Sequence, residues 1–188
     1  WCGSTTCEFA YGSVVADQTV GGINAAANDP SIALGANGNP ILSFVVSPDD
    51  LAVAICADPQ CFASTTTVLD QTGGVGWYSS ITMSPGGNPV ISYNDYSNDD
   101  LKVAACSNST CSASTVTTVD STGDVGSNTS IAIGPDGWPI IVYRNSSGAL
   151  HIAECENSTC AGKRTFLLDS RSDWIPLDTP STAIAITA

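Results

Sequence analysis

The residues with the clearest chemistry in this sequence are its eight cysteines, which form four pairs of identical C-x4-C spacing. The pairs are Cys2 and Cys7, Cys56 and Cys61, Cys106 and Cys111, and Cys155 and Cys160. Zinc-ligand pairs usually sit closer together and often include histidine, whereas this chain has a single histidine. We therefore predict four local disulfides, one within each pair, and a secreted, extracellular location.

An acidic cluster offers a second kind of chemistry. Asp95, Asp99 and Asp100 carry hard oxygen ligands that could hold calcium. The cluster matches no EF-hand or nonapeptide pattern, and the corresponding segment 144–148 of the next copy has no acid. Calcium is therefore the one cofactor under consideration, and a solvated loop is the competing interpretation.

No group of residues in the sequence resembles a catalytic constellation. His151, the sole histidine, lies where other copies of the repeat have Ala52 and Lys102, and no copy supplies the oriented partner that a general base needs. A sialidase-like glycoside hydrolase would need an arginine cluster, but all three arginines fall in the last third of the chain, and the S-x-D-x-G-x-x-W box is absent. We predict that the protein is not an enzyme.

Four N-x-S/T sequons are candidate glycosylation sites and suit a glycoprotein outside the cell. They begin at Asn108, Asn128, Asn145 and Asn157.

Several aromatic residues occupy loop positions that vary between copies of the repeat. These are Trp77, Tyr78, Trp138 and Trp174. Exposed aromatic rings on loops can stack on sugars or fill partner pockets. A lectin-like, carbohydrate-binding function is therefore an alternative to a purely structural one.

The charge balance excludes two classes of partner. Against 18 acidic residues stand 5 basic ones, for a formal net charge of −13. Nucleic acids and anionic membranes require clustered Lys and Arg, so we expect neither as a partner. No run of 18 apolar residues occurs, so membrane insertion is not expected either.

The cysteine pairs belong to a repeat of about fifty residues, which marks a repeat architecture. Segment 31–44 recurs at 80–93 and at 130–143. Each copy has four β-prone runs separated by Gly, Asn and Pro turn signals, with the C-x4-C loop between the third and fourth runs. Two cysteines that flank a short hairpin loop lie at disulfide distance, so each pair should clip strand three to strand four.

Four antiparallel strands followed by a short connection into the next copy are typical of a blade, so we predict an all-β fold, a β-propeller of four blades. A β-solenoid usually has shorter coils, and a sandwich has no reason to repeat a cysteine clip. The chain should be one repeat domain, 1–188. The copies span 1–30 in part, 31–79, 80–129, 130–180 and 181–188 in part.

The motifs resemble those of a known group of proteins. Gly87-Asn-Pro-Val-Ile-Ser-Tyr93, then Leu101-Lys-Val-Ala-Ala-Cys106 with its C-x4-C loop, then Val119-Asp-Ser-Thr-Gly-Asp-Val-Gly126, are similar to repeats in uncharacterised secreted or surface-exposed bacterial proteins. The resemblance covers nearly the whole chain. It implies a propeller-like fold and a location at the cell surface, and it implies no activity.

The two ends carry incomplete copies of the repeat. Trp1-Cys2 aligns with the end of strand three, and 181–188 matches strand one alone. Three outcomes are open: the terminal strands close a last blade within one chain, they complete a blade with a neighbouring subunit, or the sequence is a fragment of a longer propeller. Pairing between subunits would be heterologous and would build a filament by strand addition.

These observations favour a non-enzymatic, extracellular structural or interaction module. Its expected partner is itself, in a homo-oligomer or filament, or another extracellular protein or glycan. A carbohydrate-binding propeller ranks second, and the glycoside hydrolase ranks third.

Overall fold

The computed structural model describes residues 28–170 and 182–185, which contain twelve β-strands in three four-stranded antiparallel sheets. The first sheet comprises β1 (Asn28–Leu34), β2 (Pro40–Val46), β3 (Asp50–Cys56) and β4 (Ser64–Asp70). The second comprises β5 (Val75–Met83), β6 (Pro89–Asp95), β7 (Asp100–Cys106) and β8 (Ser114–Asp120). The third comprises β9 (Val125–Ile133), β10 (Pro139–Asn145), β11 (Leu150–Cys155) and β12 (Lys163–Asp169).

Within each sheet the strands lie in chain order and are joined by short reversals. The turn after the first strand of each sheet contains a glycine in the left-handed region, at φ 78°, 75° and 86° for Gly38, Gly87 and Gly137. Glycine reaches this conformation without a Cβ clash, so the turn is tight. A proline then opens the second strand, where no ladder donor is lost.

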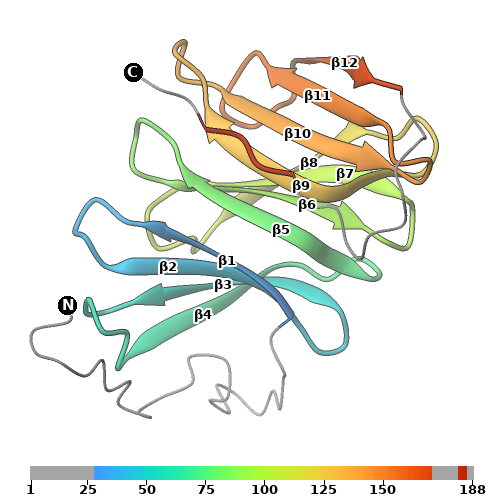
Figure 1. Ribbon diagram of the computed structural model, residues 1–188. Helices are drawn as coiled ribbons and strands as arrows, with labels where there is room; N and C mark the ends of the chain where they lie inside the picture. The colour runs from blue at the N-terminus through green and yellow to red at the C-terminus, as the bar shows by residue number, and fades with distance from the viewer. Residues whose placement is uncertain (1–27, 171–181, 186–188) are drawn as a thin grey trace, which may run out of the picture.

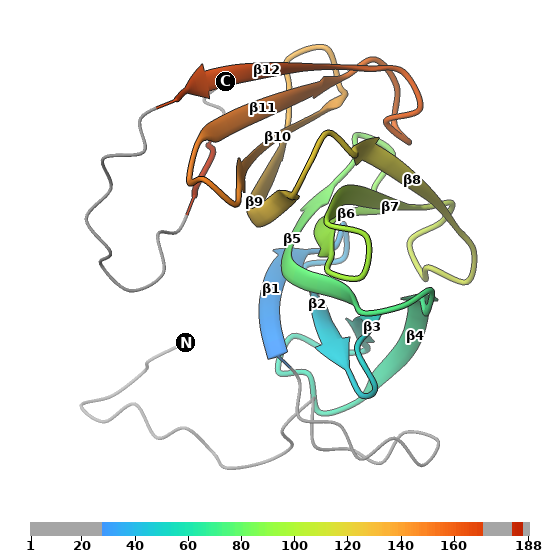
Figure 2. The same ribbon diagram turned by 90° about the vertical axis from the view of Figure 1, so that its right-hand side faces the viewer.

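The three sheets are arranged around their first strands (Figures 1 and 2). β1, β5 and β9 lie side by side at the centre, and β4, β8 and β12 form the outer edges of their sheets. No helix in the described part of the chain is long and apolar enough to cross a membrane.

Two apolar layers hold the sheets together. Between the first and second sheets, Leu51 and Val53 lie in one cluster with fully buried Tyr93. Between the second and third, Leu101 and Val103 lie in another with fully buried Tyr143. Each interface thus uses the same positions of the repeat.

The all-β fold is confirmed, but the predicted four-bladed β-propeller is wrong, and the described residues contain no last blade closed by the N- and C-terminal strands. Residues 28–170 and 182–185 form three separate four-stranded sheets, with no closed sheet. The repeat is informative about each sheet because strands and turns depend on residues close in sequence. A closed ring depends instead on long-range packing between the first and last sheets, which the repeat does not specify.

Candidate functional site

Three of the four predicted disulfides are present, and each clips the third strand of its sheet to the fourth. Cys56–Cys61, Cys106–Cys111 and Cys155–Cys160 have Cα–Cα distances of 4.8, 4.9 and 4.7 Å. The predicted Cys2–Cys7 pair lies outside the described residues. The three disulfides indicate an oxidising environment.

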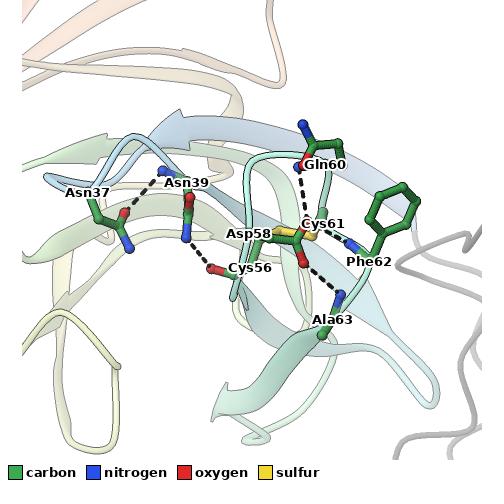
Figure 3. The surroundings of a disulfide bond; sticks show 8 residues. All are labelled: Asn37, Asn39, Cys56, Asp58, Gln60, Cys61, Phe62 and Ala63. Atoms are coloured by element: carbon green, nitrogen blue, oxygen red, sulfur yellow. Dashed lines mark hydrogen bonds between the residues drawn. A yellow bond between two sulfur atoms is a disulfide. The ribbon is translucent and has the colours of Figure 1, made fainter.

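Each disulfide loop is organised by one side chain two residues after its first cysteine. In the first sheet Asp58 Oδ1 accepts hydrogen bonds from the backbone N–H groups of Gln60 and Phe62, at 3.0 and 3.1 Å (Figure 3). Asn108 and Asn157 accept equivalent bonds in the second and third sheets. Two of the four sequons therefore coincide with loop-capping positions, a role that an aspartate performs in the first copy.

The other two sequons occupy different sites. Asn145 caps the turn after β10, where its Oδ1 accepts from Ser147 Oγ and from the Ala149 N–H, at 2.7 and 2.9 Å. Asn128 lies on β9 at φ 51°, in the left-handed region.

A buried polar network, which the sequence did not suggest, joins the first and second sheets. Tyr93 donates from its hydroxyl to Asp70 Oδ2 at 2.8 Å. Lys102 Nζ lies 3.5 Å from Asp70 Oδ2 and 2.5 Å from Asp95 Oδ2. One cation thus sits between two carboxylates at the interface.

The ionisation of this network follows from its contacts. Burial by itself raises the pKa of Asp70, but hydrogen bonds from the Thr72 backbone and from Tyr93, with the charge of Lys102, hold that pKa below its ordinary value of 3.8. Burial lowers the pKa of Lys102, but its hydrogen bond to Asp95 and the charge of Asp70 raise it above 10.5. Burial and Asp70 raise the pKa of Tyr93, which keeps the phenol protonated as a donor.

The same contact recurs one repeat later with different neighbours. Tyr143 donates to Asp120 Oδ2 at 2.6 Å. His151 replaces Lys102 and stacks on the Tyr143 ring, with centroids 5.4 Å apart. Its Nε2 atom is buried without a hydrogen-bond partner among the described residues. His151 is thus packed against Tyr143 at the repeat position that Lys102 occupies in the second sheet.

The three calcium candidates do not converge on one point. Asp95 is fully buried, and its carboxylate contacts Lys102 and the Asn98 side chain, at 2.9 Å for the latter. Asp99 adopts a left-handed φ of 59°, and Asp100 is the cross-strand partner of Asp95. In the described ranges, no group of three or more His, Cys, Asp or Glu residues is arranged to hold a metal ion.

The described basic and acidic residues needed for a sialidase-like site also lie in separate, local contacts. Arg144 donates from Nη1 to the Gly148 carbonyl at 2.6 Å. Arg164 pairs with Glu156 at 3.2 Å on the exposed surface.

A shallow groove of about 200 Å³ lies along the central strands. It is lined by Asp29, Pro30, Tyr78, Ser79, Asn128, Thr129 and Thr182. Asp29, Tyr78 and Asn128 occupy one repeat position, where φ is 48°, 54° and 51°. Three different side chains at one repeat position are thus brought into one groove.

Hydroxyl groups bond the strands that carry Asp29, Tyr78 and Asn128 to one another, so these three residues form a row of fixed spacing. Ser79 Oγ donates to the Asp29 carbonyl, and Thr129 Oγ1 donates to the Tyr78 carbonyl, both at 2.9 Å. Thr182 Oγ1 makes the equivalent bond to the Asn128 carbonyl. The segment 182–185 therefore continues the row formed by the first strands.

Tyr78 is the unusual member of the row. The left-handed conformation costs a residue with a side chain roughly 1–2 kcal/mol, and glycine or asparagine normally occupies it. Tyr78 nevertheless holds φ 54° with its side chain 41% exposed. Local backbone strain of this kind clusters at binding sites, which makes the groove the first candidate for function.

Comparison with known proteins adds fold information alone. No known protein-family profile matches this chain, and no curated protein matches it. A crystal structure of a protein of unknown function from Dyadobacter fermentans DSM 18053 is similar, with a TM-score of 0.57, 13% identity, and coverage of 80% of this chain and 42% of that chain. The chain thus spans less than half the length of that protein, with which it shares a fold.

Proposed function

We propose that this protein is a non-enzymatic, extracellular interaction module that associates with further copies of itself by strand addition at residues 182–185. One observation carries the proposal. Ile184 N–H donates to Ser130 Oγ at 3.1 Å, as Ile81 N–H donates to Ser31 Oγ and Ile131 N–H to Ser80 Oγ, both at 3.2 Å. Residues 182–185 thus run beside β9 as β9 runs beside β5.

The edge of residues 182–185 that faces away from β9 also supports the proposal. At the equivalent edge, β1, β5 and β9 each pair with the second strand of their own sheet. No described strand pairs with residues 182–185 in this way. Successive N–H groups of an extended chain point to alternate edges, so Ala183 and Ala185 direct theirs to the edge at which no described strand pairs. An uncharged edge without proline recruits strands from other chains.

Apolar surface beside this edge favours association as well. Ile152 and Phe166 are cross-strand neighbours on one face of the third sheet. Phe166 is 45% exposed. The equivalent face of the second sheet is covered by the third, through contacts that include a 2.7 Å hydrogen bond between Ser92 and Thr129.

Sedimentation velocity over a wide range of protein concentration tests this function. We expect association that grows with concentration and is suppressed by Ala185→Pro, which removes an N–H donor from the edge that pairs with no described strand. The matched control is Phe62→Ser, which removes a 64% exposed apolar side chain from a disulfide loop and should leave the association unchanged. A protein that stays monomeric at every concentration, or an Ala185→Pro variant that associates as before, refutes the proposal.

A further inference from the structure

We infer that the groove formed by Asp29, Tyr78 and Asn128 binds a carbohydrate that is neutral or positively charged. The inference goes beyond the proposed function, because strand addition uses the opposite edge of residues 182–185 and leaves the groove open.

The chemistry of the groove matches the two faces of a sugar ring. A pyranose presents C–H groups on its flat faces and hydroxyl groups around its rim. Tyr78, 41% exposed, supplies an aromatic surface for the C–H groups. Asn128 supplies amide donors and an acceptor, and its side chain forms no hydrogen bond with the described residues. A ligand can therefore be held by stacking and by hydrogen bonds at once.

Asp29 adds a charged acceptor to the same groove. Its Oδ2 accepts the Tyr78 N–H at 2.9 Å, which holds the carboxylate next to the strained residue. A carboxylate with one fixed oxygen can accept from a sugar hydroxyl through the other.

The sign of the charge limits the class of sugar. A carboxylate in the groove, on a chain of net charge −13, repels carboxylated and sulfated sugars. The groove thus favours neutral hexoses, their N-acetyl derivatives and amino sugars over acidic ones.

The repeat context explains how such a site arises without disturbing the fold. The hydroxyls of Ser79 and Thr129 contact Ser43 and Ser92 at 2.8 and 2.7 Å and are buried between sheets. The preceding residue of each strand, Tyr78 or Asn128, is turned outward at positive φ and does not take part in this packing. Its identity is therefore free to vary with the ligand.

A glycan array with neutral, amino and acidic glycans, followed by calorimetric titration of the strongest neutral or amino binder, tests the site. We expect binding by the intact protein and about tenfold or greater weakening in Tyr78→Gly, because the stacked ring is lost. Glycine adopts φ 54° without strain, so this variant keeps the backbone. Tyr96→Ala is the matched control, since Tyr96 is 71% exposed and does not line the groove.

A second pair of variants keeps the test decisive if Tyr78→Gly alters the fold. Asn128→Gly removes the amide at a position that also suits glycine, and should weaken binding, whereas Asp29→Asn keeps an acceptor for the Tyr78 N–H and should relax discrimination against acidic glycans. Three results would overturn the inference: no binding of any neutral or amino glycan, a preference for acidic glycans, or affinity unchanged in both Tyr78→Gly and Asn128→Gly. None of these results affects the sedimentation test of self-association.

Discussion

The hydroxyl of Tyr93 on β6 donates a 2.8 Å hydrogen bond to Asp70 Oδ2 at the end of β4, so the second sheet is bonded through its core to the outer strand of the first. Tyr143 and Asp120 repeat this contact between the second and third sheets. The first sheet has Phe44 at the corresponding position, which offers no hydroxyl. The repeated Tyr–Asp contact holds each sheet against the one before it. The stability of each interface therefore depends on the ionisation of the aspartate.

Removing the Tyr93 hydroxyl should weaken the first interface. Tyr93→Phe keeps the ring in the core but leaves the Asp70 carboxylate short of one donor, so we expect the free energy of unfolding to fall by roughly 1.5–3 kcal/mol. Chemical denaturation measures this. Tyr96→Phe is the control, because that side chain is 71% exposed and should change stability by less than about 0.5 kcal/mol. Equal stability of Tyr93→Phe and the unaltered protein would contradict the role of this bond.

The lowered pKa of Asp70 gives its contribution a definite pH dependence. Because the folded-state pKa lies below the ordinary 3.8, the stabilisation is present above pH 3.8 and is lost as the pH falls through the folded-state value. We expect Asp70→Asn to be destabilised relative to the unaltered protein at pH 7, and the difference to shrink in strong acid. Denaturation curves at a series of pH values measure this difference. A gap that widens below pH 3.8 would reverse the assigned sign.

Two glycines with nearly the same φ should respond differently to alanine. Gly126, at φ 88°, would place a Cβ 2.8 Å from Leu101 Cα, whereas Gly123, at φ 82°, has no atom within 4 Å of that position. Gly123→Ala carries the left-handed strain alone, about 1–2 kcal/mol. Gly126→Ala adds overpacking and should cost about 3 kcal/mol or more in the free energy of unfolding. Similar losses in the two variants would show that the close approach of β9 to β7 can relax.

Two substitutions of Asn108 can distinguish its structural role in capping the disulfide loop from its role as a candidate glycosylation site. Asn108→Asp retains the acceptor oxygen that Asp58 uses in the first sheet and destroys the sequon. We expect it to keep full stability and, if the site is occupied, to lose the mass of one glycan. Asn108→Ala removes the loop acceptor and should cost roughly 1 kcal/mol. Mass spectrometry and thermal unfolding of both variants check these outcomes, and an equally large loss of stability in Asn108→Asp would contradict the cap.

The local architecture could be predicted from the sequence because its determinants are close together along the chain. The glycines of the turns, the prolines that open β2, β6 and β10, and the C-x4-C spacing each act over a few residues. They predicted four antiparallel strands per copy and the clip between the third and fourth strands, as found in Cys56–Cys61. Ile184 contacts Ser130 beside β9, whereas the match of the whole segment 181–188 to a first strand stays a prediction.

The relations between sheets could be decided only by the tertiary structure. The positions of Tyr93 and Tyr143 suggested packing between repeats, yet their bonds to Asp70 and Asp120 join residues 23 positions apart on different strands and sheets. The groove brings together Asp29, Tyr78 and Asn128, which share no residue type, so no sequence motif marks them as one site. The calcium candidates are close in sequence, but the burial of Asp95 against Lys102 turns one of them into half of an ion pair. The repeat pattern specifies the strands and turns within each sheet. Whether the sheets close into a ring, and which side chains meet between them, depends on long-range packing that sequence periodicity does not specify.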